Sequence, residues 1–207
     1  MNDQGTPWTD LTHVGLVVRD LDLLQDLAQD RLVSVMVSIT SLDDDMKRRL
    51  EPRTASPQAR LKVIEQLSLA GVPVGVMVAP VIPSLTDHEM EHILDAAKTA
   101  GASSAGYTLL RLPHEVKDLF REWLAEHYPD RARHVMSVIN QSRDGKDYQS
   151  EFGTRMVGTG VFAQLLRKRF DVAKRKFGLN DAENRHALRT DLFRPPATNQ
   201  AQMTLGL

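Results

Sequence analysis

The stretch GVPVGVMVAPVIPSLTDHEMEHILDAAKTAG, residues 71–101, decides the class of the fold. Residues 72–82 are rich in β-branched and apolar side chains and predict a strand, which two prolines near its end should stop because proline has no amide proton to donate. Thr86 to Glu89 resembles a capping box, and the apolar positions after it predict a helix that closes at Gly101. The stretch therefore predicts one strand followed by one helix.

The same alternation continues on both sides of this unit. Towards the N-terminus, Val14 to Val18 predicts a first strand with a helix after it, and residues 32–39 predict a second strand that is buried on both faces. Ser56-Pro57 then offers an N-cap with proline at the first helical position, and residues 104–112 predict a fourth strand. Strands that alternate with helices indicate a parallel sheet and the α/β class.

The pattern changes after Pro113. Residues 116–124, 132–142 and 161–177 have the apolar spacing of amphipathic helices, and residues 142–159 between them are rich in glycine and charge. The chain is thus predicted to end in helices and an irregular tail.

Composition bounds the function. The chain has 207 residues, 42% of them hydrophobic and 26% charged, with a formal net charge of -1, so no global field draws it to nucleic acid or to a membrane. Apolar runs are too short to cross a bilayer, and we expect a cytoplasmic protein without a membrane partner. The sequence contains no cysteine, which excludes disulfides and thiolate metal sites within this polypeptide.

Candidate ligand-binding residues follow the predicted strands, because ligands of parallel α/β sheets gather at the carboxyl ends of the strands. Arg60 and Glu51 could clamp a carboxylate and a ribose hydroxyl; the alternative is a surface salt bridge between them. The apolar loop from Pro80 to Pro83 suits a flat ring, unless its prolines only end the strand and Asp87 only caps the next helix.

Two histidine motifs offer other chemistry. His88, Glu89 and His92 match the H-E-x-x-H pattern, which on a helix holds zinc with the glutamate as general base. Against zinc, Glu89 is already assigned to the capping box and no third ligand is evident. His114, which follows Arg111 at the end of the fourth predicted strand, is more typical of a capping or solvated histidine than of a catalytic one.

A basic stretch near the C-terminus supports a function of another class. Its cations alternate with aromatic residues and could bind a nucleic-acid backbone, although such charges are more often the solvated side of an amphipathic helix. The residues are Arg155, Arg167, Lys168, Arg169, Lys174, Arg175 and Lys176, with Phe152, Phe162, Phe170 and Phe177 among them. A non-catalytic nucleic-acid-binding module is therefore the alternative function.

An ordered series of segments resembles one family. The segments are RDLDLL at 19–24, VSVMVSIT at 33–40, LEPRTASPQARL at 50–61, GVPVGVMVAPVIPSLTDHE at 71–89, AGYTLLRLPHEVKDLF at 105–120, FGTRMVGTG at 152–160 and LFRPP at 192–196. Together they are similar to the radical S-adenosylmethionine (radical SAM) proteins allied to spore photoproduct lyase, often described as DNA repair photolyase-like.

The resemblance implies a partial (β/α) barrel. In that family a CxxxCxxC loop holds a [4Fe-4S] cluster, and reductive cleavage of S-adenosylmethionine gives a radical that abstracts hydrogen from substrate. By position this chain resembles the C-terminal part, about four strands, with residues 12–115 in the barrel, residues 116–192 as a helical extension, and residues 1–11 and 193–207 as flexible tails.

The resemblance also implies roles for single residues. Ser38 would face the ribose or methionyl group of the cofactor, with Glu51 and Arg60 supporting that side. Pro80 and the loop after it would line the adenine region, and Arg111 would lie near the cofactor or substrate. No residue is assigned to a metal.

The chain departs from the family pattern in two places. Thr12-His13-Val14 stands where the family usually has Thr-Lys-Ser, and the cysteine loop with the first two strands is not found in the sequence. We therefore expect the chain alone to be catalytically silent. We also expect it to self-associate or to pair with a separately encoded N-terminal half, because its first strand would lie at an open sheet edge.

Overall fold

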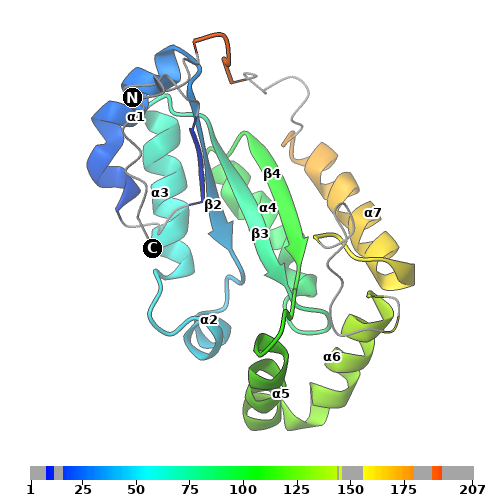
Figure 1. Ribbon diagram of the computed structural model, residues 1–207. Coiled ribbons are helices and arrows are strands. Elements are labelled where there is room, and N and C mark those ends of the chain that lie inside the picture. Colours follow the sequence, from blue (N-terminus) through cyan, green and yellow to red (C-terminus); the bar gives the residue numbers. More distant parts are fainter. Residues whose placement is uncertain (1–7, 12–15, 144, 146–155, 180–187, 193–207) are drawn as a thin grey trace, which may run out of the picture.

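The computed structural model describes residues 8–11, 16–143, 145, 156–179 and 188–192 of the chain. Strands and helices alternate through the first half and helices follow, as the sequence predicts (Figure 1). The elements are β1 (Trp8–Leu11), the 3-10 helix η1 (Val17–Asp20), α1 (Leu21–Gln29), β2 (Val33–Ile39), α2 (Asp44–Leu50), α3 (Pro57–Leu69), β3 (Val74–Val81), the 3-10 helix η2 (Asp87–Glu89), α4 (Met90–Thr99), β4 (Ser104–Leu109), α5 (Val116–His127), α6 (Pro129–Gln141) and α7 (Gly160–Lys176).

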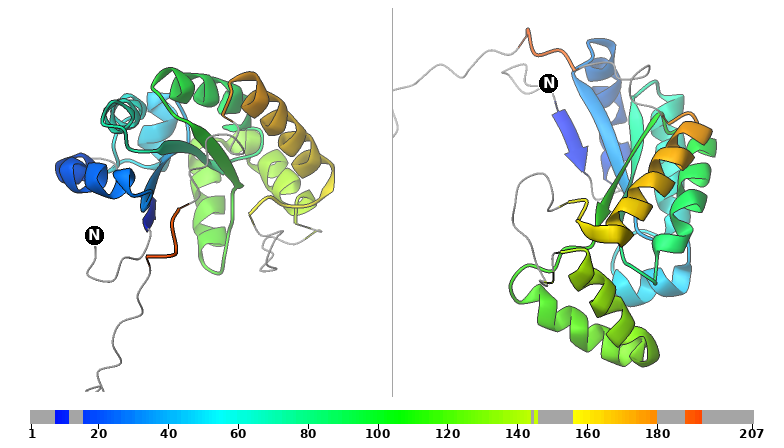
Figure 2. Two further views of the ribbon diagram at one scale, coloured as in Figure 1. Left: turned by 90° about the horizontal axis from the view of Figure 1, so that it is seen from above. Right: turned by 90° about the vertical axis from the view of Figure 1, so that its right-hand side faces the viewer.

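The described strands form one parallel sheet in the order β1-β2-β3-β4. Neighbours in the sheet are neighbours in the chain, as expected when each strand is joined to the next by a helix on one side of the sheet. Seen from above, α1, α3, α4 and α7 follow one another around one face (Figure 2, left). The α/β class is confirmed, and the arrangement is consistent with a partial (β/α) barrel.

The core lies between the sheet and these helices. On β2 the side chains at 33, 35, 37 and 39 are buried, while those at 34, 36 and 38 are half-buried on the other face. Ile64 and Leu67 of α3 and Ile93 of α4 pack into the same core, and all are fully buried. We call the other face of the sheet, which these helices do not cover, the open face (Figure 2, left).

The prediction of a first strand from Val14 to Val18 is wrong for residues 16–18, the part of this range that the structure describes. Val17 and Val18 belong to η1, with Val17 buried in the core, and the strand lies earlier, at Trp8–Leu11. Residue 14 lies outside the described residues. The prediction was based on an apolar run. The strand β1 instead forms where the backbone pairs with β2, and this pairing cannot be inferred from local composition.

The predicted strand ends also need correction. Pro80 does not stop β3, which continues to Val81 and pairs there with Leu109 after a register shift between Val78 and Val81. Proline is tolerated where the ladder is interrupted in this way. The fourth strand ends at Leu109 instead of Leu112.

The later helices lie in two places. Helices α5 and α6 lie with α2 beyond the carboxyl ends of the strands, and they bury a second cluster that includes Phe120 and Leu124 (Figure 1). Helix α7 returns to the main core through Leu166 and Phe170. Among the described residues, no helix is both long enough and apolar enough to cross a bilayer.

A short segment before α7 ties the helices to the sheet. The amide of Leu109 in β4 donates to the carbonyl of Met156 at 2.8 Å, and the amide of Thr159 donates to the carbonyl of Ser142 at 2.9 Å. Gly158 has φ +75, and a Cβ atom there would lie 2.7 Å from Leu109 Cδ2. Only glycine fits this approach without strain.

Candidate functional site

The carboxyl end of β2 carries a buried hydroxyl that joins two neighbouring strands. Thr40 Oγ1 lies 2.7 Å from Glu51 Oε1 and 2.9 Å from the carbonyl oxygen of Ala79. A hydroxyl has one proton, so these two acceptors share it. Thr40 thereby links the end of β2 to the Ala79-Pro80 peptide of β3.

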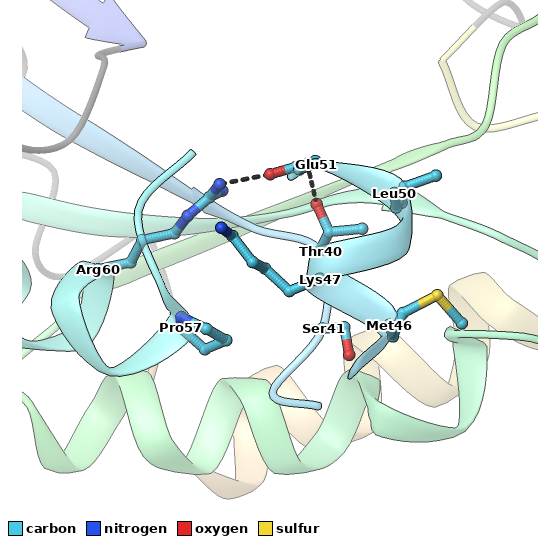
Figure 3. A pocket seen from close by; sticks show the side chains of 8 residues that line it. All are labelled: Thr40, Ser41, Met46, Lys47, Leu50, Glu51, Pro57 and Arg60. Carbon is cyan, nitrogen blue, oxygen red and sulfur yellow. Dashed lines mark hydrogen bonds and ion pairs between the residues drawn. The ribbon is translucent and has the colours of Figure 1, made fainter. Parts of the chain in front are cut away.

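Arg60 packs against the same end of β2, and its side chain is buried, with only 8% of the residue exposed. Its Nη1 donates to the carbonyl of Ser38 at 2.7 Å, its Nε to the carbonyl of Ala55 at 3.2 Å, and its Nη2 to Thr54 Oγ1 at 2.8 Å. Nη2 also donates to the carboxylate of Glu51, as Figure 3 shows. Ser56 caps α3 by accepting from the amide of Ala59, so Arg60 is held one turn into the helix. The guanidinium therefore fixes the main chain of β2.

The ion pair between Arg60 and Glu51 is present and mostly buried, not at the surface. Most donors of Arg60 are directed to protein acceptors, and both oxygens of Glu51 accept hydrogen bonds from protein groups. This geometry favours support of the ligand-facing strand over direct clamping of a ligand.

The pKa of Glu51 is lowered by this surrounding. Burial acts to raise the pKa, but the hydrogen bonds from Thr40, Arg60 and Thr54 and the charge of Arg60 outweigh burial and hold it below its usual range. The carboxylate is therefore charged at neutral pH and acts as an acceptor.

A small cavity lies between α2 and the start of α3 (Figure 3). Only about 10 Å³ of it is open to the centre of a water molecule, which is room for a single water. Its lining residues are Thr40, Ser41, Met46, Lys47, Leu50, Glu51, Pro57 and Arg60. A nucleoside cannot enter this cavity.

The open face carries small side chains with two methionines among them. Ser38 is in register with Met77, and Met77 with Gly106, across three strands. The half-buried Ser38 lies at the carboxyl end of β2, and Ser34 lies on the same face at the amino end. The methionines lie over the glycines of the neighbouring strands, since a Cβ atom on Gly106 would be 2.9 Å from Met77 Cε. The Ser38 hydroxyl is a group on this face that can make a hydrogen bond to a ligand.

The sequence predicts that Glu89 is either the partner in a capping box or the general base of a zinc site, and the structure gives it a different role. Its carboxylate accepts from Ser41 Oγ at 2.7 Å and from the amide of Leu42 at 2.8 Å, so it joins the start of α4 to the loop after β2. The capping box is therefore wrong: Thr86 instead accepts from the amide of Ile82 at 2.8 Å. The long-range partners of Glu89 displaced the local hydrogen bond that sequence spacing predicted.

The zinc alternative finds no support. Glu89 is used by the β2 loop, and His88 lies in η2, before the regular turns of α4 begin. In the part of the chain that is described, no group of three or more histidine, aspartate or glutamate side chains could hold a metal ion.

Asp87 is not the helix cap that the sequence suggested as an alternative. Its Oδ1 accepts from the amide of Ser84 at 2.6 Å, and its Oδ2 lies 3.4 Å from Nη1 of Arg169. Sequence reasoning had assigned Arg169 to a basic surface, but its guanidinium turns inward to α4.

Arg111 belongs to a different group from Ser38, Glu51 and Arg60. It follows β4 by two residues, and its Nη1 lies 3.6 Å from the sulfur of Met156. Nearby, the fully buried Arg143 donates to the carbonyls of Leu109 at 3.2 Å and Leu110 at 2.9 Å. Sequence reasoning missed Arg143 because it lies in a stretch whose glycines and charges indicated a linker.

The predicted site residues are thus brought together in part. Ser38, Glu51 and Arg60 form one network, and Thr40 connects it to the peptide before Pro80. Thr54, which also contacts Arg60, gave no sequence signal beyond its place in the loop. Thr12 and His13 lie outside the described residues.

The fold is that of a parallel α/β protein, consistent with the partial (β/α) barrel class. Residues 5–97 match the sequence profile of the Radical SAM superfamily. The match supports assignment to the radical SAM family at the level of the superfamily.

The chain is also similar to several uncharacterized proteins. One from Mycobacterium tuberculosis (strain H37Rv) is 39% identical over 128 residues, which are 61% of this chain and 38% of the relative. One from Acidianus two-tailed virus is 41% identical over 72 residues, 35% of this chain and 23% of the relative. One from Methanocaldococcus jannaschii is 26% identical over 120 residues, 58% of this chain and 43% of the relative. The matches thus span less than half the length of each relative, and no solved structure gives a significant match.

Proposed function

We propose that this chain contributes the cofactor-facing wall of a radical SAM barrel allied to spore photoproduct lyase, and that S-adenosylmethionine binds on the open face of β2, β3 and β4. The observation that carries the proposal is the network behind Ser38. Arg60, Glu51 and Thr40 use buried hydrogen bonds to fix the carboxyl ends of β2 and β3, while the face in front carries the Ser38 hydroxyl beside Met77. Rigid support of this kind is what a preorganised binding site requires.

The residues present fit the nucleoside and amino-acid parts of S-adenosylmethionine. Ser38 offers a hydroxyl to the ribose or the methionyl group, Pro80 an apolar surface to adenine, and Arg111 a cation to a carboxylate of the cofactor or substrate. Glu51 and Arg60 hold the strand in place. When bound beside an iron-sulfur cluster, S-adenosylmethionine supplies a 5'-deoxyadenosyl radical.

The [4Fe-4S] cluster of the family does not fit this polypeptide, because the sequence has no cysteine to ligate it. We therefore propose that the chain alone is catalytically silent. Anaerobic reconstitution with iron and sulfide should give no iron-sulfur absorption, and incubation with reductant and S-adenosylmethionine should give no 5'-deoxyadenosine. Appearance of both would overturn this part of the proposal.

Cofactor binding is tested separately from catalysis. Calorimetric titration with S-adenosylmethionine, and with the unreactive S-adenosylhomocysteine, should show saturable binding by the full chain. Ser38→Ala should weaken it about fivefold, the effect of one hydrogen bond of about 1 kcal/mol.

Ser34→Ala is the matched control, since it removes the same hydroxyl from the same face at the opposite end of β2. It should leave the affinity unchanged. Absence of saturable binding, or equal losses in the two variants, would overturn the assignment of the site.

A further inference from the structure

Helix α7 has two different faces. Leu166 and Phe170 point into the core and are buried, whereas Val161, Leu165 and Val172 are 84%, 55% and 56% exposed. Positions 161, 165 and 172 recur at helical spacing and lie in one row. An aliphatic row on the outside of a helix that is already packed on its other side indicates a contact surface.

The row borders a hollow between α7 and α4. The hollow has a volume of about 420 Å³, enough to accept large side chains, and most of its surface is apolar. Its lining residues are Glu91 of α4, and Lys168, Arg169, Val172, Ala173, Lys176 and Phe177. Figure 2 shows α7 beside α4 on the outside of the sheet, away from the open face.

The wall of the hollow is fixed by an ion pair. Arg169 donates to Glu91 from Nε at 2.9 Å and from Nη2 at 2.8 Å, and Nη2 also donates to the carbonyl of Asp87 at 2.9 Å. Such a bidentate pair holds both side chains in one geometry. The charge of Arg169 is thus neutralised within the protein.

Lys168 and Lys176 are different, because neither makes an ion pair with any residue in the described ranges. They flank Val172 on the same face as the aliphatic row. Carboxylates on a partner that covers the row would therefore be complementary to these two ammonium groups, of which that of Lys176 also lies 5.1 Å from the centroid of the Phe177 ring.

The aromatic residues of this region argue against a nucleic-acid partner. Phe170 is 5% exposed and lies 4.8 Å from the ring of Tyr107, and Phe162 and Phe177 pack against the core. Single-stranded nucleic acid needs exposed rings on which bases can stack. Two copies joined through this face would bring lysines against lysines, which is unfavourable.

We propose that the outer face of α7, defined by Val161, Leu165, Lys168, Val172 and Lys176, binds an amphipathic helix of a protein partner whose apolar stripe is flanked by aspartate or glutamate. The leucine-sized side chains of that helix enter the hollow beside Arg169. This mode is the helix-in-groove recognition that aliphatic rows commonly serve.

The test uses labelled helical peptides in fluorescence anisotropy with the full chain. One peptide carries leucines at i, i+4, i+7 and i+11 with flanking glutamates, and its matched partner carries lysines in place of the glutamates. The acidic peptide should bind at least about tenfold more tightly, and Leu165→Ser or Val172→Ser should weaken its binding about tenfold. Lys168→Glu should do the same and should reduce the salt dependence.

Leu69→Ser is the control, because Leu69 is 81% exposed at the end of α3, away from α7. It should not change peptide binding. Equal binding of the two peptides, tighter binding of a single-stranded DNA oligonucleotide, or self-association that Lys168→Glu abolishes would each overturn the proposal.

Discussion

Arg60 is the single residue on which the support of the candidate site depends. Replacing it by methionine removes its hydrogen bonds to Ser38, Thr54 and Ala55 and leaves Glu51 without its ion-pair partner. Loss of one partner of a buried pair costs about 3 kcal/mol, and somewhat less here because the Glu51 side chain is 24% exposed. Arg60→Met should therefore lower the free energy of unfolding by about 2 kcal/mol in urea titrations.

Arg48→Met is the matched control for this variant. Arg48 pairs with Asp45 on α2, and the two side chains are 69% and 65% exposed. An exposed pair of this kind contributes less than about 0.5 kcal/mol. Equal losses in the two variants would contradict the role assigned to Arg60.

The carboxylate of Glu51 predicts how stability depends on pH. Burial favours its protonated form, but hydrogen bonds and Arg60 together lower its folded-state pKa. A pKa lower in the folded state than in the unfolded chain means that the stabilisation is complete above the unfolded value of about 4.3 and is lost as pH falls through the folded value. The urea concentration at the unfolding midpoint should therefore decrease as the pH is lowered from 6 into the acid range, and Glu51→Gln should make this decrease smaller. An unchanged pH profile in Glu51→Gln would refute this.

The elements themselves were largely predictable, because the signals that define them are local. Ser56-Pro57 begins α3 as expected, and Asp43 caps α2 by accepting from the amides of Asp45 and Met46. What sequence reasoning missed depends on distant partners. Glu89 bonds across 47 and 48 residues to the β2 loop, and Thr40 reaches Ala79 across 39. Spacing along the chain cannot reveal such contacts.

The connection between α6 and α7 is the element most sensitive to a single methyl group. At Gly158, φ is +75, and a Cβ atom would lie 2.7 Å from Leu109 Cδ2 and 2.9 Å from the carbonyl oxygen of Ser142. Gly158→Ala should cost about 2 kcal/mol or more, from backbone strain and from the clash with β4.

Gly178→Ala separates these two causes. Gly178 has φ +64, with nothing within 4 Å of its Cβ position, so only backbone strain of about 1 kcal/mol is expected. Thermal unfolding of both variants measures the difference. If Gly178→Ala were as destabilising as Gly158→Ala, the packing of this segment on β4 would not matter.

The described sheet has two unlike edges. The edge of β4 is partly covered, since the amide of Leu109 donates to the carbonyl of Met156. At the other edge, β1 pairs with β2 on one side, and no described strand lies on its other side. The open face between these edges carries the half-buried Met36 and Met77. An exposed strand edge beside apolar side chains favours pairing with another chain.

We therefore predict that the chain associates along the open edge of β1, either with itself or with a polypeptide that supplies the cysteine loop. In analytical ultracentrifugation the apparent mass of the chain should exceed the mass of the monomer and should increase with concentration. Met36→Lys should weaken the association because it puts a charge beside this edge, where Met36 is in register with Leu11 of β1. Leu69→Lys on α3 should not, since that side chain is 81% exposed. Circular dichroism would verify that both variants are folded. A wild-type chain that sediments as a monomer at every concentration, with and without a co-expressed polypeptide bearing CxxxCxxC, would refute the prediction.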